Sequence, residues 1–189
     1  NKVWATEVSL CTDCLEKNPE NPRAMYNLGL AYKLRSSGEQ DSRQRRQDLA
    51  LALKHFSDAG KTEKFRSQVG IELALIYLEM GEFDKAMEHV KQAVSLRPAS
   101  EYVRFYIEGV ILAKQGRYRE SLGLLDESVS RKDDFALSHM WRGLVRTELR
   151  MYRDALDDLL KAVELDPGNT VLLINISNLY YYLRDYKQA

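Results

Sequence analysis

The sequence predicts an all-α fold in which pairs of helices repeat along the chain. First, pairs of small residues seven apart recur with their second members at steps of 34, 35 and 34 residues, as Ala52 with Ala59, Ala86 with Ala93, Ser121 with Ser128, and Ala155 with Ala162. Second, apolar residues between them follow the period of helices. Third, stops such as Asp-Pro-Gly-Asn at 166–169 separate the helical stretches. A fixed period of this size is typical of stacked supersecondary units.

The composition fits a folded chain without a charge bias. Of the 189 residues, 28 are basic and 28 are acidic, which leaves no electrostatic footprint for nucleic acid or an anionic membrane. Uncharged apolar runs stay short of the roughly 18 residues that a membrane-spanning helix needs, and the start has no secretory signal pattern. We therefore expect no nucleic-acid partner and no direct membrane insertion of this fragment.

The first predicted helix covers residues 2–17. Its residues Trp4, Val8, Cys11 and Leu15 lie near one face, and an Asn-Pro-Glu-Asn stop follows. In the repeat frame this is a second helix without its first, so residues 1–21 are expected to be a truncated unit. Four fuller units follow at 22–66, 67–101, 102–135 and 136–169, and a further truncated unit covers 170–189.

Helices alternate with short turns through these units. We predict helices at 22–35, 44–60, 64–80, 83–96, 101–115, 118–131, 135–149, 152–165 and 170–183. Turns this short make paired helices antiparallel neighbours. The 22–66 unit carries about eleven extra residues within a polar insertion at 35–48. Its arginines are mixed with acids and lack aromatic neighbours, which favours a solvated loop or a helix extension over a nucleic-acid site.

The unit that opens at Pro22 carries a specific pattern, Met25-x2-Leu28-Gly29-x2-Tyr32. This pattern resembles that of tetratricopeptide repeat (TPR) proteins, with methionine where tryptophan is commonest. Matching residues recur over almost the whole chain, among them Leu73, Ala74, Tyr77, Gly109, Tyr118, Gly143, Tyr152 and Pro167. The resemblance implies a right-handed α-α superhelix, a solenoid of about five TPR helix pairs. The glycine has a mechanical reason, because a residue without a side chain lets a neighbouring helix pack close to the backbone.

The TPR resemblance also implies that fixed positions of each first helix line a concave groove. In this chain these positions are mostly apolar, and they give a candidate set of peptide-binding residues: Tyr26, Leu30, Ile71, Leu75, Tyr106, Val110, Met140 and Leu144. The same positions hold Lys33 and Gln68 and, on the last helix, Ile174, Tyr181 and Tyr182. An apolar groove is an exposed patch unless something fills it. The alternatives are a partner's helix or peptide, a missing part of the same protein, or closure of the superhelix upon itself.

No residue pattern points to catalysis. Cys11 and Cys14 form a lone CxxC, whereas zinc needs four ligands and the three histidines fall in separate units. Both cysteines stand at packing positions of the repeat, which predicts buried structural thiols. The motifs GxSxG, HExxH and the glycine-rich phosphate loop are absent. We therefore expect no catalytic residue, no metal and no cofactor, and a chain that is not an enzyme.

Glu108 and Arg142 stand at equivalent first-helix positions, where other units have apolar residues. Successive first helices of such a stack lie side by side. We therefore predict an inter-repeat ion pair between Glu108 and Arg142, joined by Arg146 one turn further on. The alternative is that both side chains reach solvent separately.

One TPR subfamily is disfavoured by the groove positions. Co-chaperone TPR domains grip the acidic tails of chaperones with lysine, asparagine and arginine at fixed inner positions. Here those positions hold Tyr26, Leu30, Glu72, Val103 and Ile107. The resemblance thus implies that this carboxylate clamp is missing.

The first thirty or so residues carry a second resemblance. Trp4 and Glu7, followed by the Cys14-Leu-Glu-Lys-Asn-Pro stretch, are similar to the segment after the last membrane span in the TMTC family of glycosyltransferase-like membrane proteins with TPR tails. The second aromatic residue expected near Cys11 is missing. The resemblance implies an extracytoplasmic location for a fragment of such a parent, whereas a separate scaffold would be cytoplasmic.

The sequence therefore predicts a non-catalytic scaffold that binds a helix or an extended apolar peptide of a protein partner in its concave groove. The alternative is a TPR appendage of a membrane-bound glycosyltransferase-like protein that serves assembly or substrate docking. Self-association through an exposed terminal helix is a further alternative.

Overall fold

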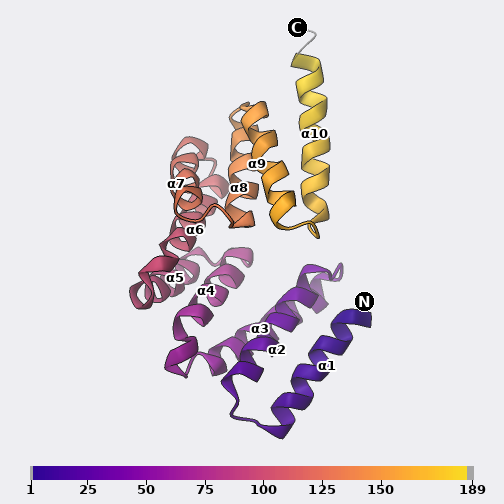
Figure 1. The fold of residues 1–189 in the computed structure, drawn as a ribbon, viewed down its shortest axis with the longest axis vertical. Coiled ribbons are helices and arrows are strands. Elements are labelled where there is room, and N and C mark those ends of the chain that lie inside the picture. The colour runs from indigo at the N-terminus through magenta and orange to yellow at the C-terminus, as the bar shows by residue number, and fades with distance from the viewer. Residues whose placement is uncertain (1, 187–189) are drawn as a thin grey trace. The chain divides into compact units, whose positions relative to one another are not determined.

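The computed structural model describes the backbone of residues 2–186 and the side chains of residues 7–169 and 172–183. Within these residues all regular structure is helical, with ten α-helices and one short 3-10 helix (Figure 1). The chain divides into two compact units, Asn1–Pro98 and Ala99–Ala189. The predicted all-α fold is confirmed.

The first unit contains five helices, which are α1 (Lys2–Lys17), α2 (Pro22–Ser37), α3 (Ser42–Ala59), α4 (Glu63–Glu79) and α5 (Phe83–Leu96). Helices α2 and α3 form one packed pair and α4 and α5 form the next. Helix α1 packs against α2, as α3 packs against α4. This is the contact pattern of a second helix against the first helix of the following repeat, as the sequence frame predicts for residues 2–17.

The second unit opens with the 3-10 helix Pro98–Ser100 at its boundary. Its α-helices are α6 (Glu101–Lys114), α7 (Tyr118–Arg131), α8 (Ala136–Glu148), α9 (Tyr152–Leu165) and α10 (Thr170–Tyr186). Helices α6 and α7 pair, α8 and α9 pair, and α10 packs on α9. The predicted helices at 2–17, 83–96, 118–131 and 152–165 have the observed ends, and the others differ by one to three residues at an end.

The turn inside three of the helix pairs has the same backbone geometry. Gly81 and Gly116 have φ angles of 77° and 76°, and Arg150 has 62° at the equivalent place. A left-handed residue at a helix end lets the following N–H groups bond back to the last free carbonyls. Accordingly the N–H groups of Glu82, Arg117 and Met151 donate to carbonyls five residues earlier, at 2.8 to 3.0 Å.

Close contact within the helix pairs depends on glycine in the first helix. A Cβ added to Gly29 would lie 2.8 Å from the Phe56 ring, and one added to Gly143 would lie 2.8 Å from Leu159. Gly109 has the same relation to Leu125, at 2.9 Å. The predicted reason for this glycine, close packing of a neighbouring helix, is confirmed.

The small residues that define the repeat lie at these interfaces. All eight are buried: Ala52, Ala59, Ala86, Ala93, Ser121, Ser128, Ala155 and Ala162. The two serines satisfy their hydroxyls by donating to backbone carbonyls, Ser121 to Gly109 at 2.7 Å and Ser128 to Tyr102 at 2.8 Å. Small size is therefore what the position requires, and a hydroxyl is tolerated where a carbonyl accepts it.

The insertion at 35–48 is a helix extension, the second of the two predicted alternatives. It lengthens the end of α2 and the start of α3 around a short turn at 38–41. Asp48 is fully buried there, and its carboxylate accepts two hydrogen bonds from the Arg35 guanidinium, at 2.6 and 2.8 Å. Gln44 donates a third at 3.0 Å. A buried carboxylate is tolerated because each oxygen is paired.

Candidate functional site

The inner positions of α2 and α4 meet around the hydroxyl of Tyr26. The Tyr26 ring is buried in the core and packs against Phe56, with ring centroids 5.4 Å apart. Its hydroxyl donates to Glu72 at 3.3 Å and accepts from Gln68 at 2.8 Å. Burial, followed by the nearby Glu72 carboxylate, raises the pKa of Tyr26 well above its usual value. Tyr26 is thus a neutral, structural hydrogen-bonding residue in this unit.

A cross-helix ion pair lies beside this tyrosine. The Lys33 ammonium on α2 is 2.6 Å from the Glu72 carboxylate on α4, and both side chains are mostly buried. Three of the predicted groove residues, Leu30, Ile71 and Leu75, are half-buried. The inner positions of α2 and α4 are therefore a mixed surface, with apolar side chains beside a paired charge.

In the second unit the side chains at the inner positions are buried on α6 and half-buried on α8. Tyr106 and Val110 on α6 are only 4% and 1% exposed, and Tyr106 packs edge-on against Phe135 with centroids 5.2 Å apart. Met140 and Leu144 on α8 are half-buried. Tyr106 and Val110 hold the helices together in this structure, so surface available to a ligand begins at α8.

Helix α10 carries most of the exposed apolar surface of this unit. The residues concerned are Leu173, Ile174, Tyr180, Tyr181 and Tyr182, which are 45% to 65% exposed. Tyr182 stacks on Tyr152 of α9, with centroids 5.3 Å apart. Helix α10 also contacts α8. Its opposite side, formed by Leu172, Ile176 and Leu179, is buried against α9.

The charged residues at equivalent first-helix positions do not form the predicted pair. Arg142 binds Asp158 of α9 through contacts of 2.6 to 3.1 Å, and Asp126 of α7 at 3.0 Å. Glu108 instead accepts two hydrogen bonds from Arg104, one turn earlier on α6. The predicted Glu108–Arg142 ion pair is wrong, because carboxylates on the flanking second helices lie closer to Arg142.

Asp158 is the centre of this charge cluster, which we call the Asp158 network. It comprises Asp126, His139, Arg142, Arg146 and Asp158. Arg146 donates to Asp158 at 2.8 Å, and the His139 Nδ1 atom lies 3.4 Å from the same carboxylate. Desolvation opposes ionisation of Asp158, yet its cationic and imidazole neighbours hold its pKa below the usual range. Arg146 takes part as predicted, although with a different carboxylate.

Two unusual residues in the repeat pattern indicate this network. Asp158 occupies the second-helix position that holds His55 and His89 in earlier repeats. A carboxylate at a position that faces the first helix, combined with Arg142 at a normally apolar place, indicates a buried pair. When two charged residues stand at unusual positions of the same repeat, the simplest interpretation is that they pair with each other and not with a residue of a neighbouring repeat.

The remaining candidates show no assembled chemical site. Cys11 is half-buried and Cys14 is exposed, so the prediction of two buried thiols is wrong for Cys14. Among the described residues no group of three acidic, histidine or cysteine side chains could hold a metal ion. Over the same residues, no helix combines the length and hydropathy needed to cross a bilayer.

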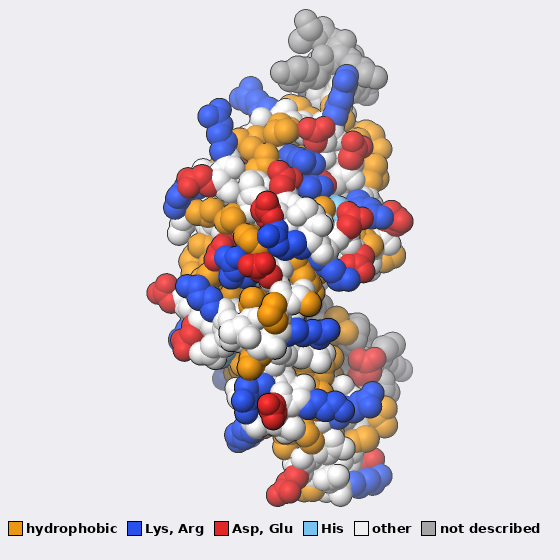
Figure 2. Space-filling view, turned by 60° about the vertical axis from the view of Figure 1, so that its left-hand side comes forward, with side chains coloured by type: hydrophobic (Ala, Val, Ile, Leu, Met, Phe, Trp, Pro, Cys, Tyr) orange, Lys and Arg blue, Asp and Glu red, His pale blue; other side chains and the backbone are white. Residues whose placement is uncertain are grey.

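The face of the molecule in Figure 2 shows lysine and arginine side chains interspersed with aspartate and glutamate, and hydrophobic side chains between them. On that face no single-sign patch gathers. The distribution agrees with the equal numbers of basic and acidic residues in the chain.

Comparison with curated proteins finds relatives over nearly the full chain. Human protein O-mannosyl-transferase TMTC3 is 24% identical over 203 residues, covering 100% of this chain and 21% of that protein. Its mouse counterpart is 24% identical over 199 residues, covering 98% of this chain and 20% of that protein. The chain therefore spans about a fifth of the length of the curated relatives that it matches.

Solved structures with the same fold are more distant in sequence. The human IFIT1 dimer with m7Gppp-AAAA aligns with a TM-score of 0.74 at 16% identity, over 100% of this chain and 44% of that one. The first TPR domain of Spaghetti (RPAP3), bound to an HSP90 peptide, aligns with a TM-score of 0.52 at 17% identity, over 62% of this chain and 93% of that one.

Family models agree with these folds along most of the chain. Three models described as tetratricopeptide repeat match residues 10–59, 71–100 and 106–170. Together these ranges include most of the residues of helices α2 to α9. The chain belongs to the tetratricopeptide repeat family.

Proposed function

We propose that this chain is a non-catalytic scaffold that binds an amphipathic helix or an extended apolar peptide of another protein. The observation that carries the proposal is the apolar character of the inner positions of the second unit. Ile174 and Tyr181 of α10 are 63% and 65% exposed, and α10 contacts α8, which bears the half-buried Met140 and Leu144. Contiguous apolar surface of this kind marks interaction sites.

The proposed contact residues are those predicted groove positions that a ligand can reach. In the second unit they are Met140 and Leu144, joined by Ile174 and Tyr181. In the first unit they are Leu30, Ile71 and Leu75, beside the Lys33–Glu72 pair. Tyr26, Tyr106 and Val110 then act indirectly, because they fix the helices that present the contact residues. Amphipathic helices bind such faces through anchors at i, i+3 and i+4.

The charge distribution supports a polypeptide partner over a nucleic acid. Nucleic-acid binding draws on clusters of unpaired basic residues. Here the basic and acidic residues are equal in number, and Arg142 and Arg146 are already paired with Asp158. Burying two or three large apolar side chains contributes about 1.5 to 3 kcal/mol each, which after the cost of association supports weak binding, with a dissociation constant on the order of 1 mM.

The test uses peptides selected from a random library on the purified chain. Ile174→Asp and Tyr181→Asp remove exposed apolar groups from α10, and each is expected to weaken peptide binding at least about tenfold, since a charge must then be desolvated. Leu160→Asp is the matched control on α9, where the side chain is also 45% exposed. Equal affinity of all three folded variants in fluorescence polarisation would refute this binding surface.

A second role is supported by the match to TMTC3. We propose that the chain serves as the TPR part of a membrane-bound glycosyltransferase-like protein, where the same surface docks substrate proteins or assembles the enzyme. The support is the similarity to TMTC3 across the whole chain at 24% identity. The transcript that encodes this chain is expected to encode several apolar spans of about 20 residues upstream of Asn1. Soluble repeats in their place would contradict this role.

A further inference from the structure

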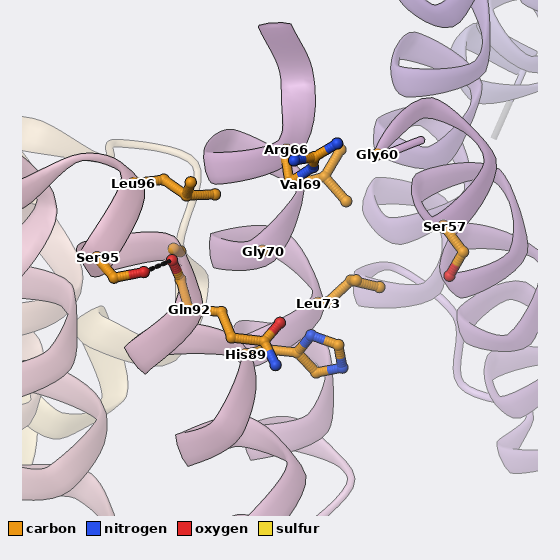
Figure 3. Close-up of a pocket in the computed structure, with 11 residues that line it drawn as sticks. Ser57, Gly60, Arg66, Val69, Gly70, Leu73, His89, Gln92, Ser95 and Leu96 are labelled. Atoms are coloured by element: carbon orange, nitrogen blue, oxygen red, sulfur yellow. Dashed lines mark hydrogen bonds between the residues drawn. The ribbon is translucent and has the colours of Figure 1, made fainter. Parts of the chain in front are cut away.

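A pocket of about 450 Å³ lies in the first unit between α3, α4 and α5 (Figure 3). Figure 3 shows its lining residues, among them Ser57 on α3, Arg66, Val69, Gly70 and Leu73 on α4, and Gln92 and Leu96 on α5. The α4 residues of this lining lie on the side of the helix opposite Ile71 and Leu75. The pocket is therefore separate from the inner surface proposed above.

A glycine lies in the pocket lining at Gly70, where α5 packs close to the backbone of α4: a Cβ added there would lie 3.0 Å from the Cβ of Ala93. Gly70 stands four residues before the small interface residue Ala74. Phe105 stands four before Gly109, and His139 stands four before Gly143. Two later repeats thus place a planar ring at the position where α4 has only a hydrogen atom.

In the second unit these rings are held by charged neighbours. Two guanidinium groups lie near the Phe105 ring, with the Cζ atoms of Arg104 and Arg131 at 4.3 and 4.4 Å from the ring centroid. His139 is 4% exposed and belongs to the Asp158 network. The repeat architecture therefore accommodates a ring at this place when neighbouring groups surround it.

The surroundings of this place in the first unit are mainly apolar and include one cationic side chain. The floor is apolar, formed by Val69 and Leu73, which are 3% and 7% exposed. Leu96 is 52% exposed at the wall, and Arg66 lies on the same side of α4. Among the described side chains no carboxylate pairs with Arg66, so its guanidinium is available to stack on a ring.

We propose that this pocket accepts one aromatic side chain of a polypeptide partner, in the place that Phe105 and His139 fill in later repeats. The volume suffices, because a cavity of about 150 Å³ already binds benzene. The ring lies over Val69 and Leu73 beside Leu96, with the Arg66 guanidinium against its face. Ser57 and Gln92 supply hydroxyl and amide groups at the mouth for hydrogen bonds to the backbone of the bound segment.

The experiment is a titration of the ¹⁵N-labelled chain with N-acetyl-L-phenylalaninamide, followed by NMR. Saturable shifts are expected at the amides of Gly60, Gly70 and Leu96, with a dissociation constant on the order of 1 mM for so small a ligand. N-acetyl-L-alaninamide is the matched probe without a ring, and it is expected to cause no saturable shift there.

Two variants complete the test. Leu96→Asp places a charge in the apolar wall and is expected to weaken binding at least tenfold, and Arg66→Ala is expected to weaken it several-fold. Met80→Asp is the matched control, because Met80 is also exposed in the first unit but does not line the pocket.

Three results would overturn the proposal: no saturable shift, equal losses in Leu96→Asp and Met80→Asp, or shifts centred on Leu30 and Leu75. The last result would favour the inner surface, so the two proposals fail separately.

Discussion

At the scale of single residues, Asp158 has the most demanding environment in the described chain. It is 3% exposed, and its carboxylate accepts hydrogen bonds from two guanidinium groups and lies close to the His139 imidazole. Such a cluster offsets the cost of burying charge only while every member is paired. The Nε atom of Arg146 is nevertheless buried without a hydrogen-bond partner.

Replacement of Asp158 by asparagine tests this balance. Asp158→Asn leaves Arg142 and Arg146 without their central carboxylate, and the free energy of unfolding is expected to fall by about 3 to 5 kcal/mol. Asp126→Asn is the control, because the Asp126 side chain is 48% exposed and solvent screens its charge. That variant is expected to lose less than about 1 kcal/mol in urea denaturation. Similar losses in both variants would contradict the central role of Asp158.

His139 gives the network a pH dependence. Its Nδ1 faces Asp158, and its Nε2 lies 2.8 Å from the carbonyl oxygen of Asp133, so both nitrogens face acceptors and the protonated ring is favoured. The hydrogen bond to Asp158 is the largest cause that raises the pKa of His139 above 6.5. The stabilisation is therefore complete below pH 6.5 and is lost as the pH rises through the folded-state pKa.

The expected measurement is the difference in unfolding free energy between the wild-type chain and His139→Gln. This difference should shrink as the pH rises from about 6 to 8. Burial lowers the pKa values of His55 and His89, which gives the opposite slope, but both histidines are present in both proteins and cancel. Asp158 stays ionised over this range, because its pKa lies below 3.8. A difference independent of pH would contradict the assignment.

At the scale of the helix, close packing rests on a glycine of the first helix in three of the helix pairs, whereas the α4–α5 pair has Ala74 at that position. A Cβ on Gly143 would meet Leu159 at 2.8 Å and the Ala155 carbonyl oxygen at 3.1 Å. The carbonyl belongs to the backbone of α9, so the helices themselves would have to separate. Gly123 on α7 is different, since nothing lies within 4 Å of its added Cβ.

These two glycines form a matched pair for mutation. Gly143→Ala is expected to destabilise the chain by about 1 to 3 kcal/mol through overpacking. Gly123→Ala is expected to stabilise it by up to about 1 kcal/mol, because alanine has the higher helix propensity. Thermal or urea unfolding followed by circular dichroism measures both. If Gly143→Ala instead stabilised the chain, α8 and α9 would have room for the added methyl group, and the close packing described here would be contradicted.

At the scale of the whole chain, a repeat protein is stabilised chiefly by contacts between neighbouring helices. Within the described residues α1 packs on α2 alone, whereas α8 packs on α6, α7, α9 and α10. Local opening therefore costs less free energy at α1 than at α8.

Amide hydrogen exchange is expected to show this gradient. Protection in α8 should exceed that in the middle of α1 by at least about a hundredfold, since few contacts are broken when α1 opens. Exchange followed by mass spectrometry of peptides from both helices measures the difference. Uniform protection from α1 to α8 would indicate instead that the chain opens as one cooperative body.

Most of the architecture could be predicted from the sequence. The spacing of Ala52, Ala86, Ser121 and Ala155 set the repeat, and helix periods with short turns gave the elements to within a few residues. These signals are local or strictly periodic, and helix pairing depends on little else. The exposure of the inner positions could not be predicted from the sequence, since Tyr26, Tyr106 and Val110 are buried while Ile174 and Tyr181 are exposed.

The sequence by itself determined that this protein is a stack of helix pairs, because period, small interface residues and turn residues all act over short distances along the chain. Only the tertiary structure decided which charges meet, which inner side chains are exposed, and where the pocket between α3, α4 and α5 lies. Each of these depends on side chains brought together from two or three helices, where differences of a few ångströms select one partner over another. The pairing of Arg142 with Asp158 in place of Glu108 shows that selection most directly.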